Sequence, residues 1–153
     1  MNPMTFAQIQ RDLERYPRMH GYYLCKTVRM QWNWEMDEER SLTTAFEALD
    51  DHPWPPHERH PVEQRGADYE VVESQAREHT VTALVGGIEI GHARETIPHD
   101  IAILIWDRFR KLFSPQARFF VRLSLGDPEY VFQSGAVVVD EEYAGCLWVV
   151  ESD

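Results

Sequence analysis

The sequence predicts an α+β domain in which helices pack on one face of an antiparallel sheet. Three observations lead to this fold class. The spacing of apolar residues changes between helix and strand periods along the chain, and the last third consists of strand-like runs joined by short turns. The chain has 153 residues, 43% of them hydrophobic, which is enough for one buried core. We therefore expect a single domain, residues 1–153, that no linker divides.

The first helix is expected over residues 5–16. Thr5 opens a capping box and Pro17 ends the pattern. Between them the apolar residues recur with the spacing of one helix face: Phe6, Ile9, Leu13 and Tyr16. From Tyr22 to Met36 the period changes to two, which predicts a long strand with one buried face.

A second helix is expected after Ser41, which can cap it, and its apolar positions are Leu42, Ala45, Phe46 and Leu49. Residues 52–66 contain four prolines and no period, and they predict a long loop. Two strands should follow, at about 69–76 and 79–91. Gly86 and Gly87 indicate a bulge or a bend in the second of them.

A third helix is expected after Thr96 and Pro98. Its predicted apolar face consists of Ile101, Leu104, Ile105, Phe109, Leu112 and Phe113. The rest of the chain predicts a meander with strands at about 119–125, 130–139 and 143–150. From Tyr22 to Leu125 the element order is also that of a ferredoxin-like core built on a split βαβ arrangement, with an extra N-terminal helix and a C-terminal hairpin.

The net charge of −11 is concentrated in blocks. Residues 31–60, 61–90 and 121–153 are acidic, whereas 1–30 and 91–120 are slightly basic. Blocks of one sign can form a binding patch. With a pI near 5.0 the chain should repel phosphates, so we expect no direct binding of nucleic acid or anionic lipid.

Localisation follows from apolar runs and cysteines. The longest apolar runs are far shorter than the ~20 residues that span a bilayer, and the amino terminus lacks the pattern of a secretory signal. Cys25 and Cys146 form no disulfide framework, and we expect both to be buried and inert. The sequence therefore predicts a cytoplasmic protein with no membrane insertion.

Two acidic clusters are candidate sites for a partner protein with a basic surface. The first contains Glu35, Asp37, Glu38 and Glu39, followed one short helix later by Asp50 and Asp51. The second contains Asp127, Glu129, Asp140, Glu141 and Glu142. Trp54, flanked by prolines, is a candidate anchor, because tryptophan is enriched in interface hot spots. The alternatives are a solvated edge, ordinary turn chemistry, and a Trp54 that pins its own loop.

Histidines suggest an alternative of another class, a small metal- or histidine-dependent enzyme. The 52–66 loop contains His52, His57 and His60, whose spacing matches no zinc motif. A second group precedes or begins the third helix: His92, Glu95, His99 and Asp100. No nucleophile motif accompanies it, and helix capping by Thr96 with Asp100 is the simpler interpretation. We therefore expect no metal, no cofactor and no enzymatic activity.

The function predicted is that of an acidic protein that inhibits or neutralises a basic, nucleic-acid-binding partner. In size and charge the chain resembles toxin-immunity proteins and small phage inhibitors of host defence systems, such as anti-CRISPR proteins. Mimicry of nucleic acid by the acidic clusters is one way to achieve this. A third alternative is a structural homodimer that buries Trp32 and Trp34 at a sheet edge.

Overall fold

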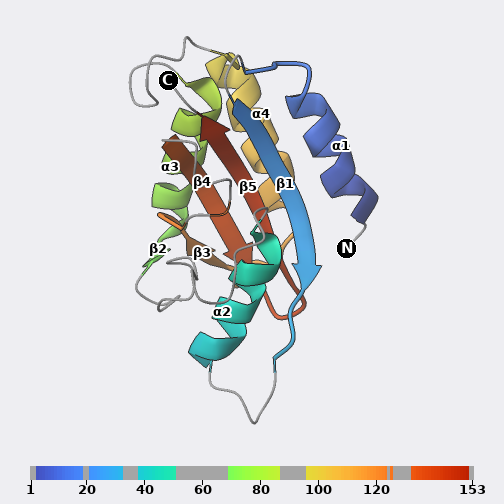
Figure 1. Cartoon of the computed structure of the whole chain (residues 1–153), viewed down its shortest axis with the longest axis vertical. Helices are drawn as coiled ribbons and strands as arrows, with labels where there is room; N and C mark the ends of the chain where they lie inside the picture. Colours follow the sequence, from blue (N-terminus) through green and yellow to red (C-terminus); the bar gives the residue numbers. More distant parts are fainter. Residues whose placement is uncertain are drawn as a thin grey trace.

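The computed structural model describes residues 3–18, 21–32, 38–50, 69–86, 96–123, 125 and 132–151. Within these ranges the chain forms four helices and a five-stranded antiparallel sheet, which confirms the α+β class (Figure 1). The helices are α1 (Pro3–Leu13), α2 (Glu38–Leu49), α3 (Glu73–Val85) and α4 (His99–Arg110). The strands are β1 (Gly21–Arg29), β2 (Glu70–Val71), β3 (Arg118–Phe120), β4 (Phe132–Val139) and β5 (Tyr143–Glu151).

The sheet has the strand order β1-β5-β4-β3-β2, and every neighbouring pair is antiparallel. Strands β3, β4 and β5 follow one another in sequence and in space, so the predicted meander is confirmed. β1 pairs with the outer side of β5, with Gly21 opposite Glu151 and Arg29 opposite Tyr143. The ferredoxin-like refinement is not confirmed, because the sheet keeps β3, β4 and β5 in consecutive order and residues 79–85, which that element order required as a strand, form a helix.

Helices cover both faces of this sheet, and the prediction of one covered face is wrong. On one face α1, α3 and α4 bury their apolar side chains against β1, β4 and β5. On the other face α2 packs Leu42, Phe46 and Leu49 against residues that include Trp148 of β5. Because helices lie on both sides, successive residues of β1 are buried at Tyr23, Leu24 and Cys25, and β5 is buried from Ala144 to Glu151.

Residues 79–85, predicted as the first part of a strand at 79–91, form the second half of α3 instead, and residues 87–91 lie outside the described residues. The strand predicted at 69–76 is reduced to β2. β-branched residues such as Thr80 and Val81 suggested a strand, but the buried residues follow helix spacing: Ala76, Thr80, Ala83 and Leu84. Gly86 is the C-cap of α3 with φ of 77°, which glycine adopts without strain. It therefore marks a helix end and not a bulge.

The other elements form where expected, with shifted boundaries or faces. α2 begins at Glu38, so Ser41 lies inside the helix and does not cap it. Pro98 is the N-cap of α4, so the expected cap by Thr96 is not formed, and Leu104 is 57% exposed although we expected it on the buried face. β1 ends at Arg29. The predicted strand continued to Met36, but residues 30–32 are not part of the strand, and residues 33–36 lie outside the described residues, as does the 52–66 loop.

Membrane insertion can be checked on the described helices. None of them is long and apolar enough to cross a membrane.

Candidate functional site

Half of the residues predicted to bind a partner belong to the described part of the chain: Glu38, Glu39, Asp50, Asp140, Glu141 and Glu142. The others lie outside it: Glu35, Asp37, Asp51, Trp54, Asp127 and Glu129. Of the 26 acidic residues, 11 lie outside the described ranges, against only 3 of the 15 Lys and Arg. The described ranges therefore have a net charge of −3, and the remaining residues account for −8 of the total of −11.

The first acidic cluster is divided between the two ends of α2. Glu38 and Glu39 occupy its first turn, where negative charge stabilises the helix dipole. Glu38 also forms an ion pair with Arg118 of β3. The pKa of Arg118 is raised, mainly because its guanidinium donates a hydrogen bond to Glu70. Asp50 follows the last residue of this helix of 12 residues, which is about 18 Å long, so it does not join Glu38 and Glu39.

The second cluster closes the hairpin between β4 and β5. One carboxylate oxygen of Asp140 accepts the backbone N–H groups of Glu142 and Tyr143, both at 2.8 Å, and the other accepts the N–H of Ser114 at 3.0 Å. The Ser114 hydroxyl donates to Glu141 at 3.0 Å. Turn chemistry therefore explains Asp140 and part of the position of Glu141, while Glu142 is exposed.

The chain leaves β1 beside this hairpin turn. The backbone N–H of Met30 donates to the carbonyl of Glu142 at 2.8 Å, and the ring N–H of Trp32 donates to the carbonyl of Asp140 at 3.4 Å. Trp32 is 40% exposed. Figure 1 shows α2 beginning at the same end of the sheet as the β4–β5 turn. We call this end of the molecule the acidic end, formed by Trp32, Glu38, Glu39, Glu141 and Glu142.

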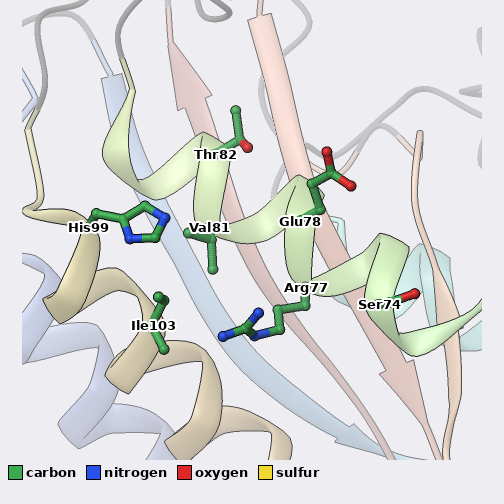
Figure 2. A pocket seen from close by; sticks show the side chains of 7 residues that line it. All are labelled: Ser74, Arg77, Glu78, Val81, Thr82, His99 and Ile103. Carbon is green, nitrogen blue, oxygen red and sulfur yellow. The ribbon is translucent and has the colours of Figure 1, made fainter.

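His99 lies elsewhere, in a pocket of about 320 Å³ between α3 and α4 (Figure 2). Figure 2 shows His99 and Ile103 on α4 and Arg77 and Val81 on α3. Ser74 and Thr82 also line the pocket. Among the described residues, His99 forms no hydrogen bond to either hydroxyl, although a nucleophile requires a base within that reach. The pocket thus gives no support for acid/base chemistry, and His92 and Glu95 lie outside the described residues.

The described ranges contain no group of three or more His, Cys, Asp and Glu side chains that could hold a metal ion. His52, His57 and His60 lie outside these ranges. Cys25 and Cys146 are both buried, as predicted, and form no disulfide. They sit on opposite faces of the sheet, and burial raises the pKa of the Cys25 thiol, which keeps it in its unreactive protonated form.

The sequence reasoning missed a buried ion pair between Arg18 and Glu151. The Arg18 guanidinium donates to the Glu151 carboxylate at 3.0 Å and to the carbonyls of Ala83 and Leu84 at 2.6 Å each. It thereby binds the last turn of α3 to the end of β5. The one signal in the sequence is Glu151 itself, an acidic residue directly after the apolar run of β5.

No protein-family model, curated protein or solved structure matches this chain.

Proposed function

We propose that this protein is a non-enzymatic inhibitor that uses its acidic end to occupy a basic, nucleic-acid-binding surface of a partner protein. The observation that carries the proposal is the exposed Trp32 beside the acidic β4–β5 turn, at the end of the sheet where α2 begins with Glu38 and Glu39. An exposed aromatic side chain and a rim of one charge are the two components of an electrostatically guided interface. Toxin-immunity proteins and phage anti-defence inhibitors are classes that act in this way.

The charges around Trp32 support an electrostatic encounter. Glu39 and Glu142 are exposed, and Glu35 and Asp37 belong to the short connection between Trp32 and α2. Arg118 compensates Glu38 and Glu70 nearby, so the excess negative charge comes from the remaining acidic residues. Complementary charge of this kind raises association rates by tenfold or more at low salt and places the interface over the partner's nucleic-acid site.

The test begins with capture of the partner from a lysate of the source organism and identification of the bound protein by mass spectrometry. The double variant Glu39→Lys/Glu142→Lys should then lower the association rate constant for that partner at least about tenfold at low salt. Wild-type affinity should fall steeply as salt rises to about 0.5 M, because the Debye length shrinks to a few ångströms. Trp32→Ala should instead raise the dissociation rate constant.

A matched control variant distinguishes binding by the acidic end from a general effect of net charge. Glu78→Lys/Asp100→Lys changes the charge by the same amount, and it likewise reverses one residue in the first turn of a helix and one exposed residue. This control should bind nearly as well as the wild type. Equal losses in the two double variants, or an affinity independent of salt, would reject the acidic end as the binding surface.

A further inference from the structure

β1 is an edge strand, and its first half is covered by a side chain. The Gln10 carbonyl oxygen of α1 accepts the backbone N–H of Cys25 at 2.8 Å, and the Gln10 amide donates to the carbonyl of Tyr23 at 3.1 Å. One amide side chain thus takes the place of a neighbouring strand. Since exposed strand edges pair readily with other chains, this contact protects the first half of the edge.

The second half of the same edge has no such cover. In an antiparallel strand alternate residues direct both backbone groups to the same side, so Thr27 and Arg29 present theirs outward like Tyr23 and Cys25. Among the described residues, no donor or acceptor meets the outward groups of Thr27 and Arg29. Figure 1 shows α1 beside the first half of β1 and not along the second half. In the part of the chain that the structure describes, nothing pairs with the outward edge of this half, which we call the open half.

A groove of about 260 Å³ lies along the open half, between β1 and α2. Its lining includes Val28 and Arg29 from β1 and the small residues Ser41, Thr44, Ala45 and Ala48 from α2. Ser41 is 3% exposed, and its hydroxyl has no hydrogen-bond partner among the described residues. A buried hydroxyl without a partner is unfavourable, and a ligand in the groove would supply one.

We propose that the open half of β1 and this groove form a docking site for an extended segment of the basic partner protein, which would add to the sheet as a further strand beside β1. Its backbone would pair with Thr27 and Arg29, and a Ser, Thr or Asn side chain would enter the groove and bond to Ser41. The choice of a basic partner rests on the proposed function. A second copy of this chain fits less well, because two chains of charge −11 repel each other.

The test uses a phage-displayed library of random 12-residue linear peptides, selected on the intact protein, and one synthetic peptide from that selection. Binding of the peptide should slow hydrogen exchange at the amides of Thr27 and Arg29, and selected sequences should be rich in Lys and Arg. Ser41→Ala should lower peptide affinity roughly threefold to tenfold, the effect of one hydrogen bond, without lowering the thermal midpoint of the free protein.

Proline variants give a second, matched comparison. Thr27→Pro removes an outward backbone donor and keeps the backbone bonds to β5, although it also removes the hydrogen bond of 3.0 Å from the Thr27 hydroxyl to the Ala144 carbonyl of β5. It should lower peptide affinity at least about tenfold. Val72→Pro is the control, because Val72 is 63% exposed and has φ of −76°, close to the value that proline requires. The proposal would be overturned if the peptide slowed hydrogen exchange only at amides outside β1, or if Ser41→Ala bound the peptide as tightly as the wild type. Both outcomes can be measured even if Thr27→Pro is unstable.

Two further outcomes separate this proposal from the proposed function. If the captured partner binds Thr27→Pro normally but not Glu39→Lys/Glu142→Lys, the strand site is rejected and the acidic end stands. The reverse pattern would reject the acidic end and retain the strand site. A dimeric mass with Thr27 and Arg29 already protected would show that a second copy occupies the edge, and would also overturn the proposal.

Discussion

Arg18 connects three segments that are distant in sequence through one guanidinium group. It has no exposed side-chain surface, and it contacts the Tyr23 ring at 5.2 Å in addition to Glu151 and the end of α3. Charges removed from water in this way cost desolvation free energy, which the pair recovers only while both partners are present. Replacing only one of the two partners should therefore destabilise the fold more than replacing both.

We predict that Arg18→Met lowers the free energy of unfolding by about 3–5 kcal/mol, because it leaves the Glu151 carboxylate buried without its cation. The double variant Arg18→Met/Glu151→Leu should lose much less than the sum of the two single variants. Urea unfolding of the wild type and the three variants measures both quantities. Strictly additive losses would show that the ion pair is not coupled.

At the scale of an element, α3 lacks an ordinary N-cap. Val72 holds the N-cap position in extended conformation and can offer no side-chain acceptor, so the first N–H groups of the helix lack a cap bond from this residue. Val72→Asp should raise the free energy of unfolding by about 1 kcal/mol. A thermal midpoint raised by about 2–4 °C would show this, with Val72→Ala as the uncapped control. An equal rise in both variants would contradict the capping argument.

Helices α1 and α4 are joined by an ion pair whose effect depends on pH. Arg108 donates to the Asp12 carboxylate at 2.6 Å, and this hydrogen bond lowers the pKa of Asp12. The folded-state pKa then lies below the unfolded value of about 3.9, so the pair stabilises the fold above that value and loses its effect as pH falls through the folded pKa.

Asp12→Asn should therefore lower the free energy of unfolding at pH 7 by up to about 1 kcal/mol, since the pair is partly exposed. The difference from the wild type should shrink as the pH falls below about 4. Urea unfolding at pH 7, 5 and 3 measures this difference. A difference that stays constant with pH would assign the loss to packing and not to charge.

Elements whose apolar residues follow a clear helix or strand period could be predicted from the sequence. The predictions failed where this period was weak or where the result depends on packing between distant segments. α1, α2 and the β3–β5 meander have clear periods of their own. α3 was hidden because its β-branched residues favour a strand, while the small Ala76 and Ala83 give its buried face a weak apolar signal. The covering of both sheet faces could not be predicted, because it depends on where α2 packs.

The candidate site could also be predicted only in part. The acidic residues are visible in the sequence, but the placement of Trp32 beside the β4–β5 turn results from the pairing of β1 with β5 across most of the chain. The orphan hydroxyl of Ser41 was equally unpredictable. Its sequence context suggests a cap, and only the earlier start of α2 at Glu38 turns it into a groove residue.

At the scale of the whole molecule, a helix layer on each side leaves the sheet in contact with solvent chiefly along its edges. The two edges differ in length, since β1 has 9 residues and β2 has 2. The short edge offers little backbone for another chain to pair with. Interactions through the sheet are therefore expected at β1, where Gln10 leaves the second half open.

The strand order also has a consequence for biosynthesis. β1 pairs only with β5 in the described sheet, and the ribosome makes β5 after β1, β2, β3 and β4. The apolar residues of β1 consequently leave the exit tunnel long before their partner strand exists, and the closure of this long loop must follow the translation of β5. Until then the nascent chain carries an unpaired apolar strand, and this interval is when the protein most depends on chaperones.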